Sequence, residues 1–214
     1  LMTLFIQMFR YAAEPFFFSY AKETDAKEIY AKVMNYFVIV CLLIFLGVMF
    51  YIDIVKYFIG EKFHEGLGIV PILLVANMFL GVFYNLSIWY KLTDRTRFGA
   101  YLSVFGAMVT LVMNVLLIPV IGYTGSAWAT FTCYCAMMVL SYFLGQKYYY
   151  VKYNIKKILG YLAFALILYF ISWLIRDIPV AIKLTINTLL LLLYVIVIIY
   201  FEKPSLLKYI KIRK

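Results

Sequence analysis

The sequence predicts an all-α membrane protein, a polytopic bundle of about seven transmembrane helices. Of its 214 residues, 66% are hydrophobic and only 14% are charged, whereas a soluble domain is nearer half apolar and a quarter charged. Seven apolar stretches each reach about 20 residues, the length a helix needs to cross the hydrocarbon core. Their hydrophobicity does not alternate residue by residue, which favours helices over the strands of a membrane barrel.

Short connections join the predicted spans, so no linker separates two soluble domains. We expect a lobe of five spans at residues 1–147, two additional peripheral spans within 148–201 and a basic cytoplasmic tail at 202–214. The chain opens inside an apolar helix, without the basic segment of a signal peptide. We therefore expect it to be the C-terminal half of a longer protein whose N-terminal lobe is missing. The predicted spans are residues 1–20, 30–52, 68–90, 98–119, 124–146, 157–175 and 179–201.

Lysine and arginine are divided unequally between the two sets of alternating loops. Fifteen of the 20 fall in one set, which includes the C-terminus. Because cytoplasmic loops are rich in these residues, we expect that set in the cytoplasm of a multi-pass protein of the bacterial inner membrane. The net charge of +10 then reflects topology and anionic lipid headgroups rather than a nucleic-acid partner. The fifteen are Lys22, Lys27, Lys32, Lys91, Arg95, Arg97, Lys147, Lys152, Lys156, Lys157, Lys203, Lys208, Lys211, Arg213 and Lys214.

The first predicted span holds two charges, Arg10 and Glu14, one helical turn apart, with Pro15 directly after them. Arg10 lies twelve residues before Lys22, or about 18 Å along a helix, which is near the middle of a core about 30 Å thick. Inserting such a charge costs about 2.5–3.5 kcal/mol, and a pair within one helix returns only about 0.3–0.5. Two interpretations remain: a structural ion pair between helices, or a cavity whose cation binds an anionic substrate and whose carboxylate exchanges a proton or binds Na⁺.

Further polar residues lie in the first five spans. The sixth span is interrupted only by Ser172 and Trp173, and the seventh is apolar on all sides over its second half. Polar side chains inside a membrane bundle usually face its interior or a hydrated cavity. The substrate or lumen candidates are therefore Arg10, Glu14, Gln7, Asn77, Asn85 and Asn114. The candidates for a hinge or for close packing are Pro15, Pro119, which we expect to end its helix, Gly122 and Gly125.

No pattern of an enzyme, a metal site or a cofactor site is found in the sequence. The three cysteines fall in apolar segments without metal or redox spacing, and the single histidine, His64, is expected to be an ordinary loop residue. No nucleophile–base pair is found. We therefore expect neither covalent catalysis, nor a bound metal, nor a cofactor.

The segment NVLLIPVIGYTGSAWAT, residues 114–130, resembles the N-x-x-L-I-P-x-x-G-x-x-G-x-A-x-A-T signature of polysaccharide exporters. These belong to the multidrug/oligosaccharidyl-lipid/polysaccharide exporter superfamily. FRYAAEPFFFSYAKE, residues 9–23, resembles the helix that precedes the ninth span of such proteins. The resemblance to O-antigen flippases implies one lobe of a two-lobe alternating-access transporter, with two extra C-terminal helices.

Such flippases move polyprenyl-pyrophosphate-linked oligosaccharides across the bacterial inner membrane, for surface polysaccharide and lipopolysaccharide biosynthesis. The resemblance implies a lipid-linked oligosaccharide as substrate, membrane lipids as further partners and coupling to protons or sodium. Arg10 would contact the pyrophosphate, and Tyr11, Tyr84 and Trp89 could contact sugar. A cation-coupled multidrug antiporter of the same superfamily is the near alternative. A membrane-embedded glycan polymerase, an acyltransferase or a structural scaffold subunit is more distant.

Overall fold

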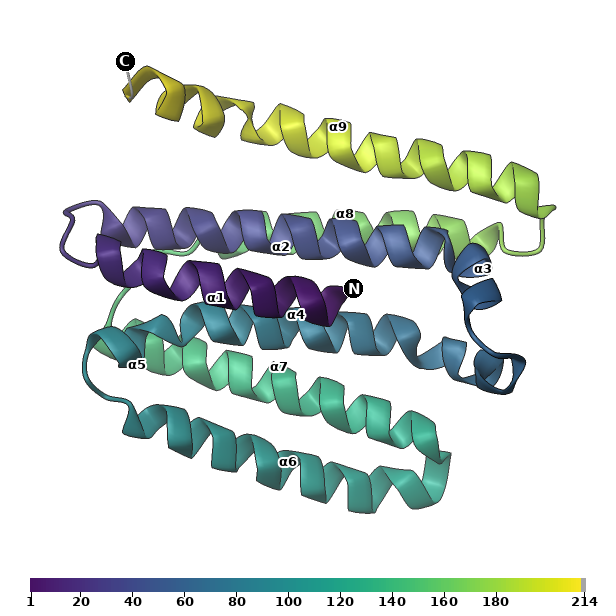
Figure 1. The fold of residues 1–214 in the computed structure, drawn as a ribbon, viewed down its shortest axis with the longest axis horizontal. Helices are drawn as coiled ribbons and strands as arrows, with labels where there is room; N and C mark the ends of the chain where they lie inside the picture. The colour runs from purple at the N-terminus through teal and green to yellow at the C-terminus, as the bar shows by residue number, and fades with distance from the viewer. Residues whose placement is uncertain (213–214) are drawn as a thin grey trace.

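The computed structural model describes residues 1–212, apart from the side chains of 62–63 and 204–212. Its long helices lie side by side along the longest axis of the molecule (Figure 1). No β-strand occurs among residues 1–212. The long helices are α1 (Met2–Tyr20), α2 (Ala26–Phe50), α4 (Val70–Leu86), α6 (Arg97–Ile121), α7 (Tyr123–Tyr148), α8 (Ile155–Leu174) and α9 (Val180–Ile212). The short ones are α3 (Ile52–Val55), α5 (Ile88–Leu92) and the 3₁₀ helices η1 (Lys56–Phe58) and η2 (Glu61–Ile69).

The structure confirms the predicted all-α polytopic membrane fold. Within the described residues, six helical segments are long and apolar enough to cross a membrane. The remaining predicted span, residues 1–20, forms α1, a 19-residue helix, but it is not among the six. Gln7, Arg10 and Glu14 lower its hydropathy. The six segments are Ala26–Phe50, His64–Leu92, Arg97–Ile121, Tyr123–Tyr148, Ile155–Leu174 and Val180–Lys203.

The two sets of connections lie at opposite ends of the bundle (Figure 1). The α1–α2 turn, α5 and the α7–α8 connection share one end with the C-terminal end of α9. The connection from α2 to α4, the α6–α7 turn and the α8–α9 turn share the other. The loops that carry most of the lysines and arginines therefore gather at one end, here called the basic end. Its cytoplasmic location remains a prediction.

Helix α2 is the centre of the packing. It contacts α1 and α4 on one side and α8 and α9 on the other, while α6 contacts α7 at the edge of the bundle (Figure 1). The main core cluster joins α2 side chains such as Cys41 and Leu46 to Ala165 of α8 and Tyr194 of α9. The two C-terminal helices therefore share one core with α1, α2 and α4.

Helix α9 is longer than the sequence predicts. The expected span ends at residue 201 and the expected tail begins at 202, but α9 continues to Ile212. The hydropathy pattern marks where apolar residues stop, and a helix can extend past that point into water. The side chains of Lys208 and Lys211, and all of Arg213 and Lys214, lie outside the described residues. Contact of the tail with lipid headgroups therefore stays a prediction.

Pro119 does not end its helix, contrary to the expectation. It lies inside α6, which continues to Ile121. A proline removes one backbone donor and disturbs the turn before it, but it does not prevent two further residues from keeping helical geometry. Helix α6 ends before Gly122, whose φ of 59° is accessible to glycine and strained for other residues.

Gly125 allows α6 and α7 to meet directly after that turn. A Cβ atom added at this position would lie 2.7 Å from the carbonyl carbon and oxygen of Leu117. Both of those atoms are backbone, so they cannot move aside as the end of a flexible side chain can. The expectation that small residues here permit close helix contact agrees with this geometry.

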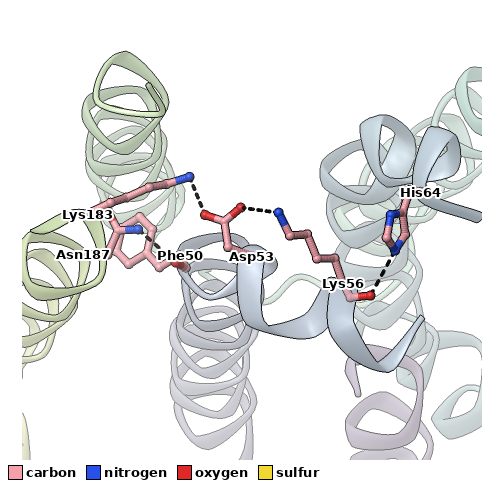
Figure 2. Close-up of polar contacts among 6 residues, drawn as sticks. All are labelled: Phe50, Asp53, Lys56, His64, Lys183 and Asn187. Carbon is pink, nitrogen blue, oxygen red and sulfur yellow. Dashed lines mark hydrogen bonds and ion pairs between the residues drawn. The ribbon is translucent and has the colours of Figure 1, made fainter. Parts of the chain in front are cut away.

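A group of polar contacts fastens α9 to α2 and α3 at the end opposite the basic end (Figure 2). Lys183 Nζ donates to Asp53 Oδ2 at 2.6 Å, and Lys56 Nζ lies 3.7 Å from Asp53 Oδ1. Asn187 Nδ2 donates to the Phe50 carbonyl at 2.9 Å, one of the carbonyls that the end of α2 leaves without a helical partner. The Lys183 side chain is only 11% exposed, so this charge depends on Asp53.

His64 belongs to the same region and holds the loop after α3 (Figure 2). Its Nε2 atom lies 3.1 Å from the Lys56 carbonyl oxygen and 3.0 Å from that of Ile59. Both partners can only accept, so Nε2 carries the hydrogen. His64 therefore closes the turn, a role that the sequence does not indicate.

We predict that Gly125→Ala destabilises the protein by about 1–3 kcal/mol, because an overpacked contact forces the backbone apart. Gly160→Ala is the matched control: this glycine lies inside α8 with nothing within 4 Å of an added Cβ, so alanine should stabilise by up to about 1 kcal/mol. Unfolding midpoints in detergent measure both changes. Equal effects of the two variants would contradict the close α6–α7 contact.

We also predict that Asp53→Ala destabilises the protein by about 1–3 kcal/mol, because it leaves the Lys183 charge buried without its partner. Lys56→Gln, which removes the half-exposed member of the group, should cost less than about 1 kcal/mol. Denaturant unfolding in micelles gives both values. If Lys56→Gln costs as much as Asp53→Ala, the Lys183 pair is not what holds α9.

Candidate functional site

The charged residues of the first span lie where α1 packs against α4 and α5. They line a small pocket near the basic end of the bundle, about two turns before α1 ends. From α1 the pocket takes two charged side chains and three apolar ones. The full lining is Phe9, Arg10, Ala13, Glu14, Phe17, Tyr84, Asn85, Ser87, Ile88 and Lys91.

Arg10 is held against aromatic rings. Its guanidinium carbon lies 4.9 Å from the centre of the Tyr84 ring on α4 and 5.7 Å from that of Tyr11. A cation over an aromatic face gains about 0.5–1 kcal/mol at an exposed site and about 2 when desolvated. The contact therefore offsets part of the cost of taking Arg10 out of water, and the charge remains.

Glu14 pairs with a residue from another helix. Its Oε1 accepts from Lys91 Nζ at 2.7 Å, and the two side chains are 38% and 28% exposed. Among the described residues, no ion pair joins Glu14 to Arg10. Of the two interpretations left open by the sequence, the structural pair between helices describes Glu14, with Lys91 as its partner. It does not neutralise Arg10.

Asn85 adds a hydrogen-bond donor to the same pocket. Its side chain is almost fully buried, at 4% exposure, and its Nδ2 atom has no hydrogen-bond partner among the described residues. A buried donor left unused costs about 1–3 kcal/mol. Two cations, one carboxylate and an unused amide donor give a pocket of net positive charge. An anion rich in acceptor oxygens, such as a phosphate, complements this set.

The pocket is small as the helices now stand. Its volume is about 20 Å³, enough for about one water molecule. A phosphate group is larger. It would therefore contact Arg10 at the mouth of the pocket, or enter after α1 moves away from α4 and α5.

The other predicted site residues do not line this pocket. Gln7 lies half-buried on α1, one turn before Arg10. Asn77 Nδ2 donates to the Leu73 carbonyl of its own helix at 2.7 Å. Asn114 lies on α6, at the edge of the bundle, and its buried Oδ1 has no partner among the described residues. Pro15 is exposed within α1, which continues through it.

The aromatic candidates for sugar contact differ from one another. Tyr84 lies in the pocket beneath Arg10, and Tyr11 is exposed. Trp89 is 2% exposed, and its indole donates to Ser141 at 3.3 Å. It is a packing residue in this structure, and no face of it is offered to a sugar.

Sequence reasoning placed Lys91 in a loop and gave it no part in the site. The predicted span ended at residue 90, so Lys91 counted only as a topological charge. In the structure α4 ends at Leu86 and the short helix α5 carries Lys91 back toward α1. Glu14 could have pointed to Lys91. This is the single acidic residue well inside the predicted spans, and a carboxylate there needs a cationic partner from another segment.

We predict that Glu14→Gln and Lys91→Gln each lower stability by up to about 1 kcal/mol, because the pair is only partly buried. The charge-swapped double variant Glu14→Lys/Lys91→Glu should recover most of that loss. A double-mutant cycle on unfolding midpoints measures the coupling. Additive effects with no recovery would mean that the contact contributes nothing to holding α1.

Comparison of the chain with protein families, with curated proteins and with solved structures found no match. The likeness to polysaccharide exporters therefore rests on the two sequence segments that carry it, 9–23 and 114–130. Family membership stays a prediction.

Proposed function

We propose that the protein takes part in moving polyprenyl-pyrophosphate-linked oligosaccharide across the bacterial inner membrane, with its C-terminus in the cytoplasm. The observation that carries the proposal is the positively charged pocket between α1, α4 and α5. Arg10 and Lys91 lie there with an unused amide donor from Asn85. Charge inside a membrane bundle is costly and usually marks a substrate pathway.

The pocket chemistry fits the diphosphate of such a lipid. A guanidinium offers a planar fork of donors that matches phosphate oxygens, and the lysine supplies a second positive charge. The sugar head would cross a hydrated cleft between the lobe of residues 1–147 and a partner lobe, while the prenyl tail stays in lipid. No covalent step is involved.

Movement of α1 would couple the pocket to transport. With only about 20 Å³ of space, the pocket in this arrangement represents the closed member of an alternating pair. Opening would separate Arg10 from the Tyr84 ring and Glu14 from Lys91. Protonation of Glu14, or sodium binding to it, would weaken the hold of Lys91 and so link opening to an ion gradient.

A cation-coupled multidrug antiporter is the second candidate, favoured by the one carboxylate in the pocket. Glu14 is already neutralised by Lys91 at 2.7 Å. An incoming organic cation would also meet the charge of Arg10. The geometry therefore supports an anionic substrate better.

We predict that Arg10→Ala lowers export of the lipid-linked oligosaccharide by about tenfold or more. Losing a charged hydrogen bond to phosphate costs about 1.5–3 kcal/mol, and about 1.4 kcal/mol corresponds to a factor of ten. Arg10→Lys should keep part of the activity because the charge remains without the fork. Surface glycan in intact cells, at matched amounts of inserted protein, is the measurement.

Arg95→Ala is the matched control for this experiment. Arg95 also lies over a tyrosine, with its guanidinium 4.3 Å from the Tyr148 ring centre, but it does not line the pocket. Its loss should leave export unchanged. Full export by Arg10→Ala would contradict the proposal, and loss of drug resistance with normal surface glycan would favour the antiporter.

A further inference from the structure

An apolar slot of about 280 Å³ lies between α4, α7 and α8, with α2 behind it. Apolar and aromatic side chains line it, among them Val38, Val82, Val139, Phe143, Leu159 and Leu162. Phe143 and Leu159 are more than half exposed, so the slot opens sideways where the surrounding bilayer lies. Its walls and its opening suit a hydrocarbon chain.

A second hollow, about 740 Å³, adjoins the slot at the basic end. It lies between the first turns of α2 and the connection that leads into α8. Four lysines line it, Lys27, Lys32, Lys152 and Lys156, against a single acidic residue, Glu28. Tyr153 and Ile155 line both hollows, so a charged hollow and an apolar one adjoin each other at these two residues.

The positive charge of the second hollow is only partly balanced within the protein. Glu28 pairs with Lys32 at 3.5 Å. Among the described residues, Lys152 and Lys156 take part in no ion pair. Lys156 also lies in the first turn of α8, which has no acidic residue. A cation there opposes the helix dipole, an unfavourable interaction that a bound anion would reduce.

Two polar groups in the hollow suit a lipid headgroup. Asn35 Oδ1 is buried without a hydrogen-bond partner among the described residues, and it can accept from a hydroxyl. Burial raises the pKa of the Tyr153 hydroxyl above its ordinary value. Tyr153 lies in the α7–α8 connection, and its hydroxyl therefore stays protonated as a donor.

We propose that this composite site binds one anionic phospholipid of the leaflet at the basic end, of the phosphatidylglycerol kind. Its phosphate lies among the lysines, its glycerol hydroxyls reach Asn35, and one acyl chain fills the slot beside Val139. Basic pockets between transmembrane helices bind such headgroups. A water-soluble anion would leave the slot empty, and a neutral lipid would leave the lysines unused.

The proposal does not depend on oligosaccharide transport. The lipid site shares no residue with the pocket of Arg10 and Lys91. A lipid bound there would contact both α7 and α8, and its binding would stabilise the folded protein by mass action. Loss of the lipid site and loss of the transport site therefore give separate results.

The headgroup is tested with the protein extracted from its own membrane in mild detergent, by counting retained phospholipids with native mass spectrometry. The wild-type protein should retain phosphatidylglycerol, and Lys152→Gln/Lys156→Gln should lose most of it. Lys22→Gln/Lys147→Gln is the control, because it removes two exposed charges from the same end without touching either hollow. Equal loss in both double variants, or in neither, would overturn the proposal.

The acyl chain is tested with Val139→Trp, which fills the slot from its open side, against Val112→Trp on the exposed face of α6. Added phosphatidylglycerol should raise the unfolding midpoint of the wild-type protein and of Val112→Trp, and not that of Val139→Trp. Inorganic phosphate and phosphatidylcholine should have little effect. An equal rise with inorganic phosphate would mean that the site binds a simple anion. An equal rise with phosphatidylcholine would mean that the lysines do not contribute to lipid binding. Stronger binding of polyprenyl phosphate would assign the site to the transport substrate. Each of these results would overturn the proposal.

Discussion

Carboxylates that lie within the bundle form ion pairs with lysines from other helices, and these pairs fix the position of each helix relative to its neighbour. Glu14 of α1 meets Lys91 of α5, Asp53 of α3 meets Lys183 of α9, and Glu202 of α9 meets Lys157 of α8. A charge that leaves water is costly unless a partner and hydrogen bonds replace the solvent. Apolar contact alone lets helices slide or rotate in lipid. The pairs therefore add a register that the hydrophobic surfaces do not supply.

Arg10 differs from these residues, because among the described residues no carboxylate forms an ion pair with it. The candidate site therefore keeps a positive charge. The contacts of Arg10 are the faces of Tyr84 and Tyr11, which attract a cation without cancelling its charge. Asn85 leaves a donor unused beside it. A bundle that neutralises the carboxylate of Glu14 but leaves the charge of Arg10 and this donor suits the acceptor-rich anion that we propose. The same excess of positive charge recurs in the lysine hollow beside α8.

The two proposed sites divide the basic end between the two sides of α2. The pocket of Arg10 lies where α1 meets α4 and α5, and the lysine hollow lies where α2 meets the connection into α8. The first is nearly closed and would need helix movement to admit a phosphate. The second is already open and adjoins an apolar slot. The proposed substrate site therefore requires helices that can move apart, whereas the proposed lipid site requires only the arrangement of helices that is already present.

The sequence alone predicted the elements well because its signals are local. Runs of apolar residues located six spans that satisfy length and hydropathy, as well as the helix that contains Arg10. The alternation of the predicted spans indicated which loops share an end. The limits of α9 and the position of Pro119 within α6 were missed, because a helix ends where its backbone geometry changes and not where its hydropathy does. Gly122, with its positive φ, marks that change in α6.

The tertiary structure decided which faces meet. The polar residues inside the predicted spans included Arg10, Glu14 and Asn85, which do share a pocket, but the sequence could not exclude Gln7, Asn77 or Asn114. It also could not bring in Lys91, because its approach to Glu14 depends on a short helix beyond the predicted span. Hydropathy and charge are properties of single residues and can be read along the chain. Which side chains contact one another depends on how the helices pack. For this pocket, only the arrangement of α1, α4 and α5 determines those contacts.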